Sequence, residues 1–155
     1  MRNFRFRLDP VVRLKEYHIE RTEEEIARIE GEIQRLLREI EEARAAVQDM
    51  RRRILEEVDD QHFIQAEREL DLFSQFTTRE EHRRFGEIAQ WNREKDQRQQ
   101  ELVKLYQDKK VLERLKERRR TEWETEMRRE EGAIMDEIGT QKYIRRQREF
   151  GGVIL

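Results

Sequence analysis

Few side chains in this sequence could act as catalysts or metal ligands, and they are scattered. The lone Ser74 has no histidine at a spacing that would bring the two together on one helix, so a serine–histidine nucleophile is not indicated. The segment "DDQH" at Asp59–His62 offers carboxylate and imidazole groups, but it lacks the spacing of a zinc or calcium site. His18 and His82 are isolated. We interpret the segment as a solvated acidic turn.

Other kinds of site chemistry are also not indicated. The absence of cysteine excludes disulfides and thiolate catalysis, and none of the six glycines lies in a phosphate-binding loop. An enzyme needs convergent groups in a cavity, which two helices packed side by side do not supply. We therefore expect no enzymatic activity, no cofactor and no metal.

The run "LERLKERRRTEW", Leu112–Trp123, could bind a charged partner. Between Arg114 and Arg120 it contains five cations and one glutamate, a local charge of +4. Such a run is either a solvated helix face or a docking surface for an acidic protein, and the sequence leaves both interpretations open. Nucleic acid is disfavoured, because glutamates flank the run on both sides and Trp123 alone makes no stacking platform.

The composition indicates how these residues are positioned. Of the 155 residues, 45% are charged and 35% hydrophobic, whereas ordinary globular domains are about one quarter charged. So little apolar surface cannot fill a compact core, while the net charge of only -2 and the abundance of helix formers argue against disorder. An all-α fold of long helices packed along a narrow seam fits best. No apolar run reaches the ~18 residues that cross a bilayer, so we expect a cytoplasmic protein that does not insert directly into a membrane.

The apolar spacing predicts a long antiparallel two-helix coiled-coil hairpin as a single unit over residues 1–155. Asp9 before Pro10 is a helix start, because aspartate can cap the first amides and proline tolerates the first turn. We predict an arm at 1–8, a first helix at 9–57, a turn at 58–62, a longer second helix at 63–148 and a tail at 149–155, with Gly151 and Gly152 ending the helix. The expected seam of the first helix consists of Val12, Ile19, Ile26, Ile29, Ile33, Leu36, Ile40, Ala43, Val47, Met50 and Ile54.

A second position for the turn, near residue 76, is also chemically reasonable, because Thr78 and Glu81 form a capping-box pattern. We prefer the turn near residue 60, which gives the apolar residues after it a seam to join. Facing residue numbers add up to a constant in an antiparallel hairpin. This turn therefore sets Leu36 against Phe85, Ile33 against Ile88 and Leu8 against Leu112.

The preferred turn has two consequences. Beyond Leu112 the second helix has no companion helix, so it can project basic residues, while the arm residues Phe4, Phe6 and Leu8 would cover Leu112 and Leu115. The phenylalanines near the turn cannot all face a two-helix seam. We expect Phe73 or Phe76 to be partly exposed, and an exposed aromatic side chain is a candidate anchor for a partner.

Two segments resemble the FliJ family of the bacterial flagellar type III export apparatus. They are the start "FRFRLDPVVRLKEY" at residues 4–17 and the block "LERLKERRRTEWETEMRREEGAIMDEIGTQKY" at residues 112–143. The resemblance implies a non-enzymatic, stalk-like coupling protein that binds and stimulates the hexameric export ATPase. It also implies links to the cytoplasmic linker of the export-gate membrane protein, escort of export chaperones, and a cytoplasmic location at the inner-membrane face of the flagellar basal body.

The resemblance also suggests site residues. A phenylalanine early in the family's second helix meets the export gate, and Phe73 matches it here, with Phe76 beside it. The apolar and histidine residues that accompany it in the family correspond to Thr77, Glu80 and Arg84, although His82 could restore part of the site. For the ATPase we expect a basic contact with an apolar anchor, formed by Arg114, Lys116, Arg118, Arg119, Arg120 and Trp123.

Two other functions compete with flagellar export. The stalk of a virulence type III secretion system shares the architecture, but the Phe-Arg-Phe-Arg-Leu start is more flagellar in character. A structural coiled-coil scaffold would be expected to keep its heptads, whereas the seam here breaks after Leu112.

Overall fold

The computed structural model describes residues 2–151. Two α-helices, α1 (Asp9–Glu57) and α2 (Phe63–Gly151), account for nearly all of these residues, and no strand occurs among them. The predicted all-α hairpin with a longer second helix is confirmed. Within the described residues neither helix has a stretch apolar enough to span a bilayer. The chain divides into two compact units, which we call the hairpin unit (residues 17–106) and the arm unit (described residues 2–16 and 107–151).

The start of α1 differs in detail from the expected cap. The carbonyl of Leu8 accepts hydrogen bonds from the amides of Val11 (2.9 Å) and Val12 (3.0 Å), so Leu8 supplies the first helical acceptor. Pro10 fits in this first turn because an amide there would have no helical partner. The Asp9 carboxylate accepts from Lys116 Nζ at 2.9 Å. Asp9 therefore connects the two helices of the arm unit.

The two helices of the hairpin unit are joined by residues 58–62. The Asp59 Oδ1 atom accepts from the His62 amide at 3.0 Å, in the manner of a residue that caps a helix. Two glutamates end α1, where negative charge is unfavourable, and this helps to stop the helix. α2 continues unbroken through Ser74–Glu81, so the alternative turn near residue 76 is absent.

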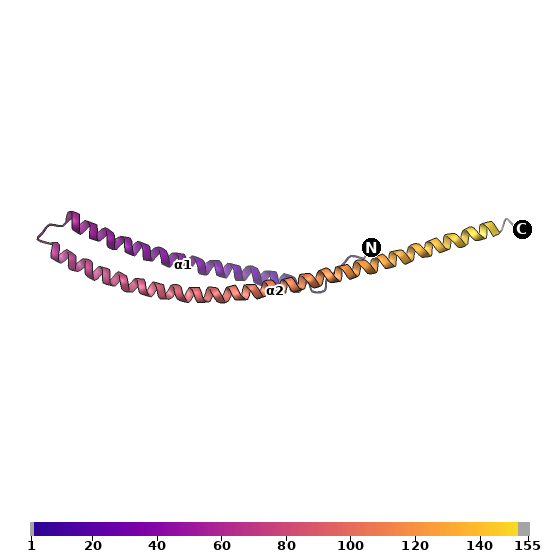
Figure 1. Ribbon diagram of the computed structural model, residues 1–155, viewed down its shortest axis with the longest axis horizontal. Helices are drawn as coiled ribbons and strands as arrows, with labels where there is room; N and C mark the ends of the chain where they lie inside the picture. The colour runs from indigo at the N-terminus through magenta and orange to yellow at the C-terminus, as the bar shows by residue number, and fades with distance from the viewer. Residues whose placement is uncertain (1, 152–155) are drawn as a thin grey trace. The chain divides into compact units, whose positions relative to one another are not determined.

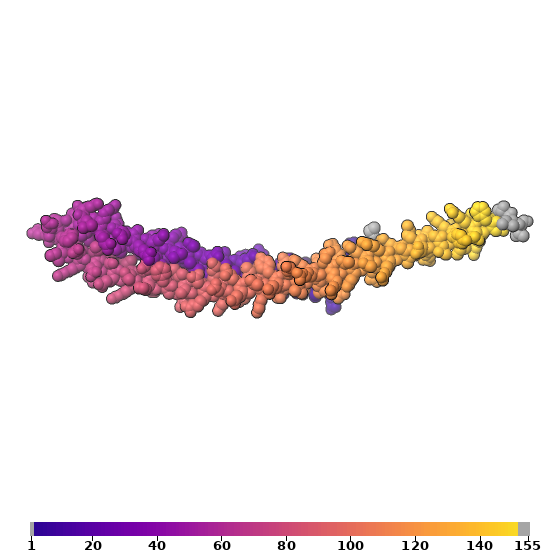
Figure 2. Space-filling view, in the orientation of Figure 1, coloured from indigo at the N-terminus to yellow at the C-terminus, as the bar shows by residue number. Residues whose placement is uncertain are grey.

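The core of the hairpin unit is a narrow seam between α1 and α2, which run side by side (Figures 1 and 2). Leu36, 2% exposed, packs with Ile40 and Ile88, and Ile33 and Trp91 cover this cluster. α1 supplies most of the buried apolar side chains, whereas α2 buries only Thr77 and Ile88 among its described residues. The narrow core follows from the composition, because these helices carry few apolar residues to bury.

Ion pairs flank the seam and fix its register. Four join α1 to α2 in the hairpin unit, and in each the two residue numbers add up to 123 or 125. They are Arg44–Glu81, Glu39–Arg84 at 3.1 Å, Glu30–Lys95 at 3.2 Å and Glu25–Arg98 at 3.2 Å. In three of the four, α1 supplies the acid and α2 the base. Each exposed pair contributes little by itself, but a shift of register would break all four together.

This register corrects the predicted pairing. Leu36 packs with Ile88 where we expected Phe85, which is 43% exposed. The physical reason is charge. The predicted register would place Glu39 opposite Glu81 or His82 and would lose the attraction between Glu39 and Arg84 that the structure has. The shift is about one helical turn, so an apolar residue still faces the seam in both registers.

The pKa values of Glu39 and Tyr106, which both pair across the seam, differ from their ordinary values. Partial burial raises the pKa of Glu39, but hydrogen bonds and charges from Arg84 and Arg35 outweigh it, so its pKa lies below the usual value. The Tyr106 hydroxyl donates to Glu23 Oε1, and this hydrogen bond raises the pKa of the tyrosine. Both contacts lie within the hairpin unit.

The final part of α2 belongs to the arm unit. Every residue from 128 to 151 is exposed. The helix ends at Gly151 and not at residue 148 as predicted, because residues 149–151 continue it. The rest of the predicted tail, residues 152–155, lies outside the described part of the chain.

Candidate partner-binding surface

The N-terminal arm lies along α2 in the arm unit. Residues 2–6 have no regular secondary structure and lead into the first turn of α1. Phe6 is buried, at 7% exposure, while the neighbouring Arg5 and Arg7 are exposed. The alternation of aromatic and basic residues in "FRFRL" thus separates a side that faces the protein from a side that faces solvent, as expected for extended backbone.

An aromatic contact attaches the arm to α2. The rings of Phe4 and Trp123 lie 6.0 Å apart between centroids and are tilted by 51°. The Arg120 guanidinium lies over the Phe4 ring, 5.9 Å from its centroid, within the range of a cation–π interaction. Trp123, which we expected to serve as an apolar anchor for a partner, is therefore half-buried against the chain's own arm.

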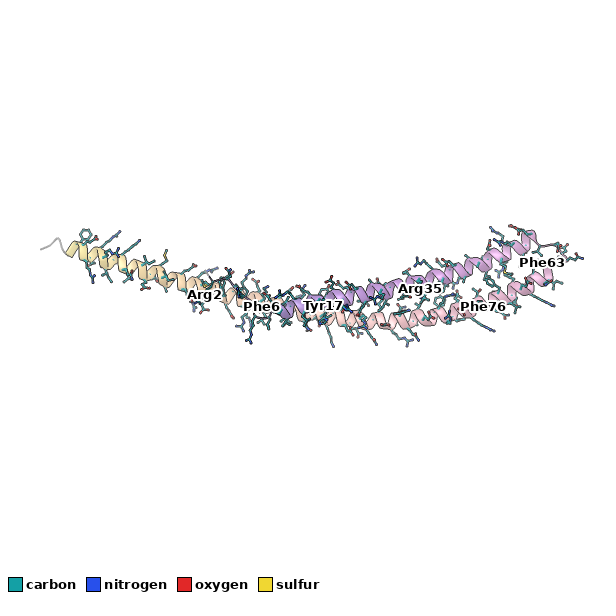
Figure 3. All side chains as sticks on the ribbon, turned by 180° about the vertical axis from the view of Figure 1, so that it is seen from behind. Arg2, Phe6, Tyr17, Arg35, Phe63 and Phe76 are labelled. Atoms are coloured by element: carbon teal, nitrogen blue, oxygen red, sulfur yellow. The ribbon has the colours of Figure 1, made fainter. Side chains whose placement is uncertain are left out.

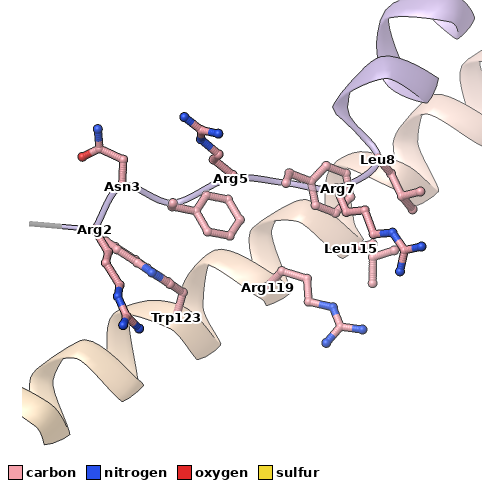
Figure 4. Close-up of a pocket in the computed structure, with 10 residues that line it drawn as sticks. Arg2, Asn3, Arg5, Arg7, Leu8, Leu115, Arg119 and Trp123 are labelled. Atoms are coloured by element: carbon pink, nitrogen blue, oxygen red, sulfur yellow. The ribbon is translucent and has the colours of Figure 1, made fainter.

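The arm and α2 together enclose an open groove (Figure 4). Arg2 lies beside Trp123 at one end, and Leu8 lies near Leu115 at the other (Figure 4). Arg119, on α2, also lines the groove. The lining residues are Arg2, Asn3, Phe4, Arg5, Phe6, Arg7, Leu8, Leu115, Arg119 and Trp123.

This part of the arm unit is strongly basic. Residues 2–16 and 107–123 contain twelve lysines and arginines against six aspartates and glutamates, a net charge of +6 in a chain whose total is -2. We call this region the basic surface. Such a concentration of one charge sign attracts acidic partners and speeds their association.

The structure places the six residues predicted for the ATPase contact in different environments on one stretch of α2. Arg114 and Arg118 are exposed, and Arg119 is exposed with Glu122 at 3.4 Å. Lys116 is half-buried and paired with Asp9. We expected Lys116 to project freely beyond the end of α1. It does not, because the register places Asp9 opposite it.

The two residues predicted for the gate contact also differ. Phe76 is 60% exposed on α2 (Figure 3), whereas Phe73 is half-buried. The family-matched positions after Phe73 are on its side of the helix, because they follow at helical spacing. Thr77 is buried, and Arg84 is paired with Glu39 on α1. Glu80 is half-buried, and His82 is exposed.

Sequence reasoning missed Arg2, Arg5 and Arg7 as site residues, and it missed the contact between Phe4 and Trp123. The available signal was the two-residue alternation of the arm, which indicates an extended segment with one basic side. The contact with Trp123 joins residues that are far apart in the sequence, and no local pattern indicates it.

Two long helices that pack along a narrow seam define a protein of the coiled-coil class. The family model described as flagellar FliJ protein matches residues 4–148, which is nearly the whole chain. The chain therefore belongs to the FliJ family of flagellar type III protein export. No curated protein and no solved structure matches it.

Proposed function

We propose that this protein is a non-enzymatic, stalk-like coupling component that binds the hexameric flagellar export ATPase and stimulates it. The observation that carries the proposal is the basic surface, with its net charge of +6 on residues 2–16 and 107–123. A stalk that meets six similar subunits in turn needs contacts that re-form readily. Exposed arginines supply such contacts, because charges in water interact weakly and are screened by salt.

Arg114, Lys116, Arg118, Arg119 and Arg120 would face acidic loops of the ATPase ring in this proposal. Arg114, Arg118 and Arg119 carry most of the contact, because their side chains are exposed. Lys116 contributes less, since its ammonium group is already paired with Asp9. Trp123 and Arg120 act mainly by holding Phe4, so they shape the surface.

The test is the ATP hydrolysis rate of the purified export ATPase from the same organism, measured with increasing amounts of this protein. A variant with Arg114→Glu, Arg118→Glu and Arg119→Glu removes three exposed cations from the surface. At about 1 kcal/mol for each reversed charge in water, half-maximal stimulation should need roughly 100-fold more protein. The matched control is Arg145→Glu, Arg146→Glu and Arg148→Glu, three exposed arginines elsewhere on α2.

The control variant should stimulate as well as the native chain. If both triple variants lose stimulation equally, only net charge matters and the assigned surface is wrong. If the native chain neither changes the rate nor co-migrates with the ring, the proposal fails altogether.

We also propose that the hairpin unit binds the cytoplasmic linker of the export gate through Phe73 and Phe76. The exposed ring of Phe76 supports this, because exposed aromatic side chains are frequent anchors at interfaces. Phe76→Ala should weaken binding of the purified linker at least tenfold, whereas Val103→Ala, at a similarly exposed apolar residue, should not. Equal binding by both variants would remove Phe76 from the interface.

Escort of export chaperones, and peripheral association with the inner membrane at the basal body, complete the proposal. Both are supported by membership of the family. Binding of unloaded chaperones to the purified protein, with and without the ATPase present, tests the escort role. Chaperones that bind only when the ATPase is present would contradict it.

A further inference from the structure

We propose that the groove between the arm and α2 binds an extended acidic segment of a partner protein, one that also carries a leucine or aromatic side chain. The inference rests on the proposed function, in which the basic surface is a contact for another protein, and it adds the chemistry that the partner must present. Three features of the groove support it: its charge, its apolar lining and the free backbone of the arm.

The charge of the groove is entirely positive. Arg2, Arg5, Arg7 and Arg119 are among its lining residues, with the Arg5 side chain extending on the side of the arm away from α2 (Figure 4), and no aspartate or glutamate is among the lining residues. Within the described part of the chain the three arm arginines make no ion pair, and Arg119 has only Glu122 at 3.4 Å. A guanidinium group binds a carboxylate through two parallel hydrogen bonds. The groove can therefore hold several carboxylates.

The groove also has an apolar lining. Phe4, Leu8, Leu115 and Trp123 contribute side chains that are only half-buried. The cavity volume is about 1070 Å³, which is about the size of a ligand pocket. A short segment with one large apolar side chain matches this size.

The backbone of the arm offers a third means of recognition. Residues 2–5 have no regular secondary structure, and their amide and carbonyl groups make no backbone hydrogen bond within the described residues. A partner segment lying beside the arm can pair with these groups as an added strand does. This feature favours an extended partner over a helical one.

A lipid surface fits the same groove less well. Phe6 is buried, and the Phe4 ring is held between Trp123 and Arg120. These aromatic side chains are thus engaged with the protein and are not presented for insertion among acyl chains. The positive charge alone would attract anionic lipids, so vesicles belong in the test.

The experiment uses the full-length protein with Trp91→Phe, which leaves Trp123 as the only tryptophan and makes its fluorescence report on the groove. Three synthetic twelve-residue peptides are titrated. The first has six acidic residues around one phenylalanine, the second replaces the acids by their amides, and the third replaces phenylalanine by serine. We expect the first to bind at least tenfold more tightly than the second and several-fold more tightly than the third.

Variants locate the site. Arg5→Glu with Arg7→Glu should weaken binding of the acidic peptide at least tenfold. Arg145→Glu with Arg146→Glu, a pair of equal charge on exposed residues of α2, should change it less than twofold. Circular dichroism confirms that both variants are helical.

Any of three results would overturn the inference. They are equal binding of the acidic and amide peptides, equal weakening by the two variants, and displacement of the peptide by phosphatidylglycerol vesicles that bind the protein more tightly than the peptide does. The last result would assign the surface to lipid. The peptide titrations contain no ATPase, so they test the groove separately from the proposed function. If the acidic peptide does not bind but the protein still stimulates ATP hydrolysis normally, the inference about the groove is refuted and the proposed function stands.

Discussion

Replacement of Leu36 by alanine tests the seam of the hairpin unit. Leu36 is 2% exposed and packs with Ile40 and Ile88, and loss of a fully buried leucine side chain costs about 2 to 5 kcal/mol. The narrow two-helix seam can relax around the cavity, so we expect a loss of about 3 kcal/mol. The neighbouring Leu37 is 37% exposed, and Leu37→Ala should cost about 1 kcal/mol or less.

Urea unfolding measures both changes. Trp91, which packs against the same cluster, reports on the seam by fluorescence once Trp123 is replaced by phenylalanine. With a slope of about 1.5 to 2 kcal/mol per molar urea, Leu36→Ala should lower the midpoint by roughly 1.5 to 2 M. Equal midpoints for Leu36→Ala and Leu37→Ala would refute the reasoning, because the two residues would then be equally buried.

Two further predictions concern the register and its charges. With cysteines introduced at Leu36 and Ile88, a disulfide should form readily under mild oxidation. A cysteine pair at Leu36 and Phe85 should form its disulfide more slowly. If the second pair reacts faster than the first, the register expected from the sequence is correct. Glu39 has a lowered pKa, so its contribution to stability is present above the carboxyl's unfolded pKa and is lost as the pH falls through the folded value. Glu39→Gln should therefore be less stable than the native chain at pH 7, and thermal unfolding should show the difference shrinking as the pH is lowered through the acidic range; a difference that does not change with pH would contradict the assignment.

The sequence predicted the kind of fold well because the relevant signals are local. The 3-4 spacing of residues such as Ile29, Ile33, Leu36 and Ile40 indicates a helix, and a cluster of acidic residues without helix-favouring apolar spacing indicates the turn. The register was not fixed by apolar spacing, because a shift of about one helical turn brings another apolar side chain to the seam. Leu36 could meet Phe85 or Ile88 with similar apolar contact.

The charged residues beside the seam indicate which of the two registers forms. Three ion pairs across the seam agree on one register: Glu25 with Arg98, Glu30 with Lys95 and Glu39 with Arg84. The register can therefore be predicted from the sequence by matching opposite charges along the two helices. The site was predicted in part, since the basic run of α2 is visible in the sequence. The arm's share of the site depends on a contact between residues at opposite ends of the chain, which no local pattern contains.

Residues 128–151 of α2 are helical although none of them is buried. In proteins most of the stability of a helix comes from the packing of its apolar face, and these residues have no such packing within the described part of the chain. The helicity of this segment is therefore an equilibrium that temperature and neighbours can shift. Met127, Ile134 and Ile138 share one face at helical spacing, and a partner that packed onto them would convert a marginal helix into a stable one. The free energy of ordering this segment would then be part of the free energy of binding. The helix content of residues 128–151 would therefore rise when a partner is bound.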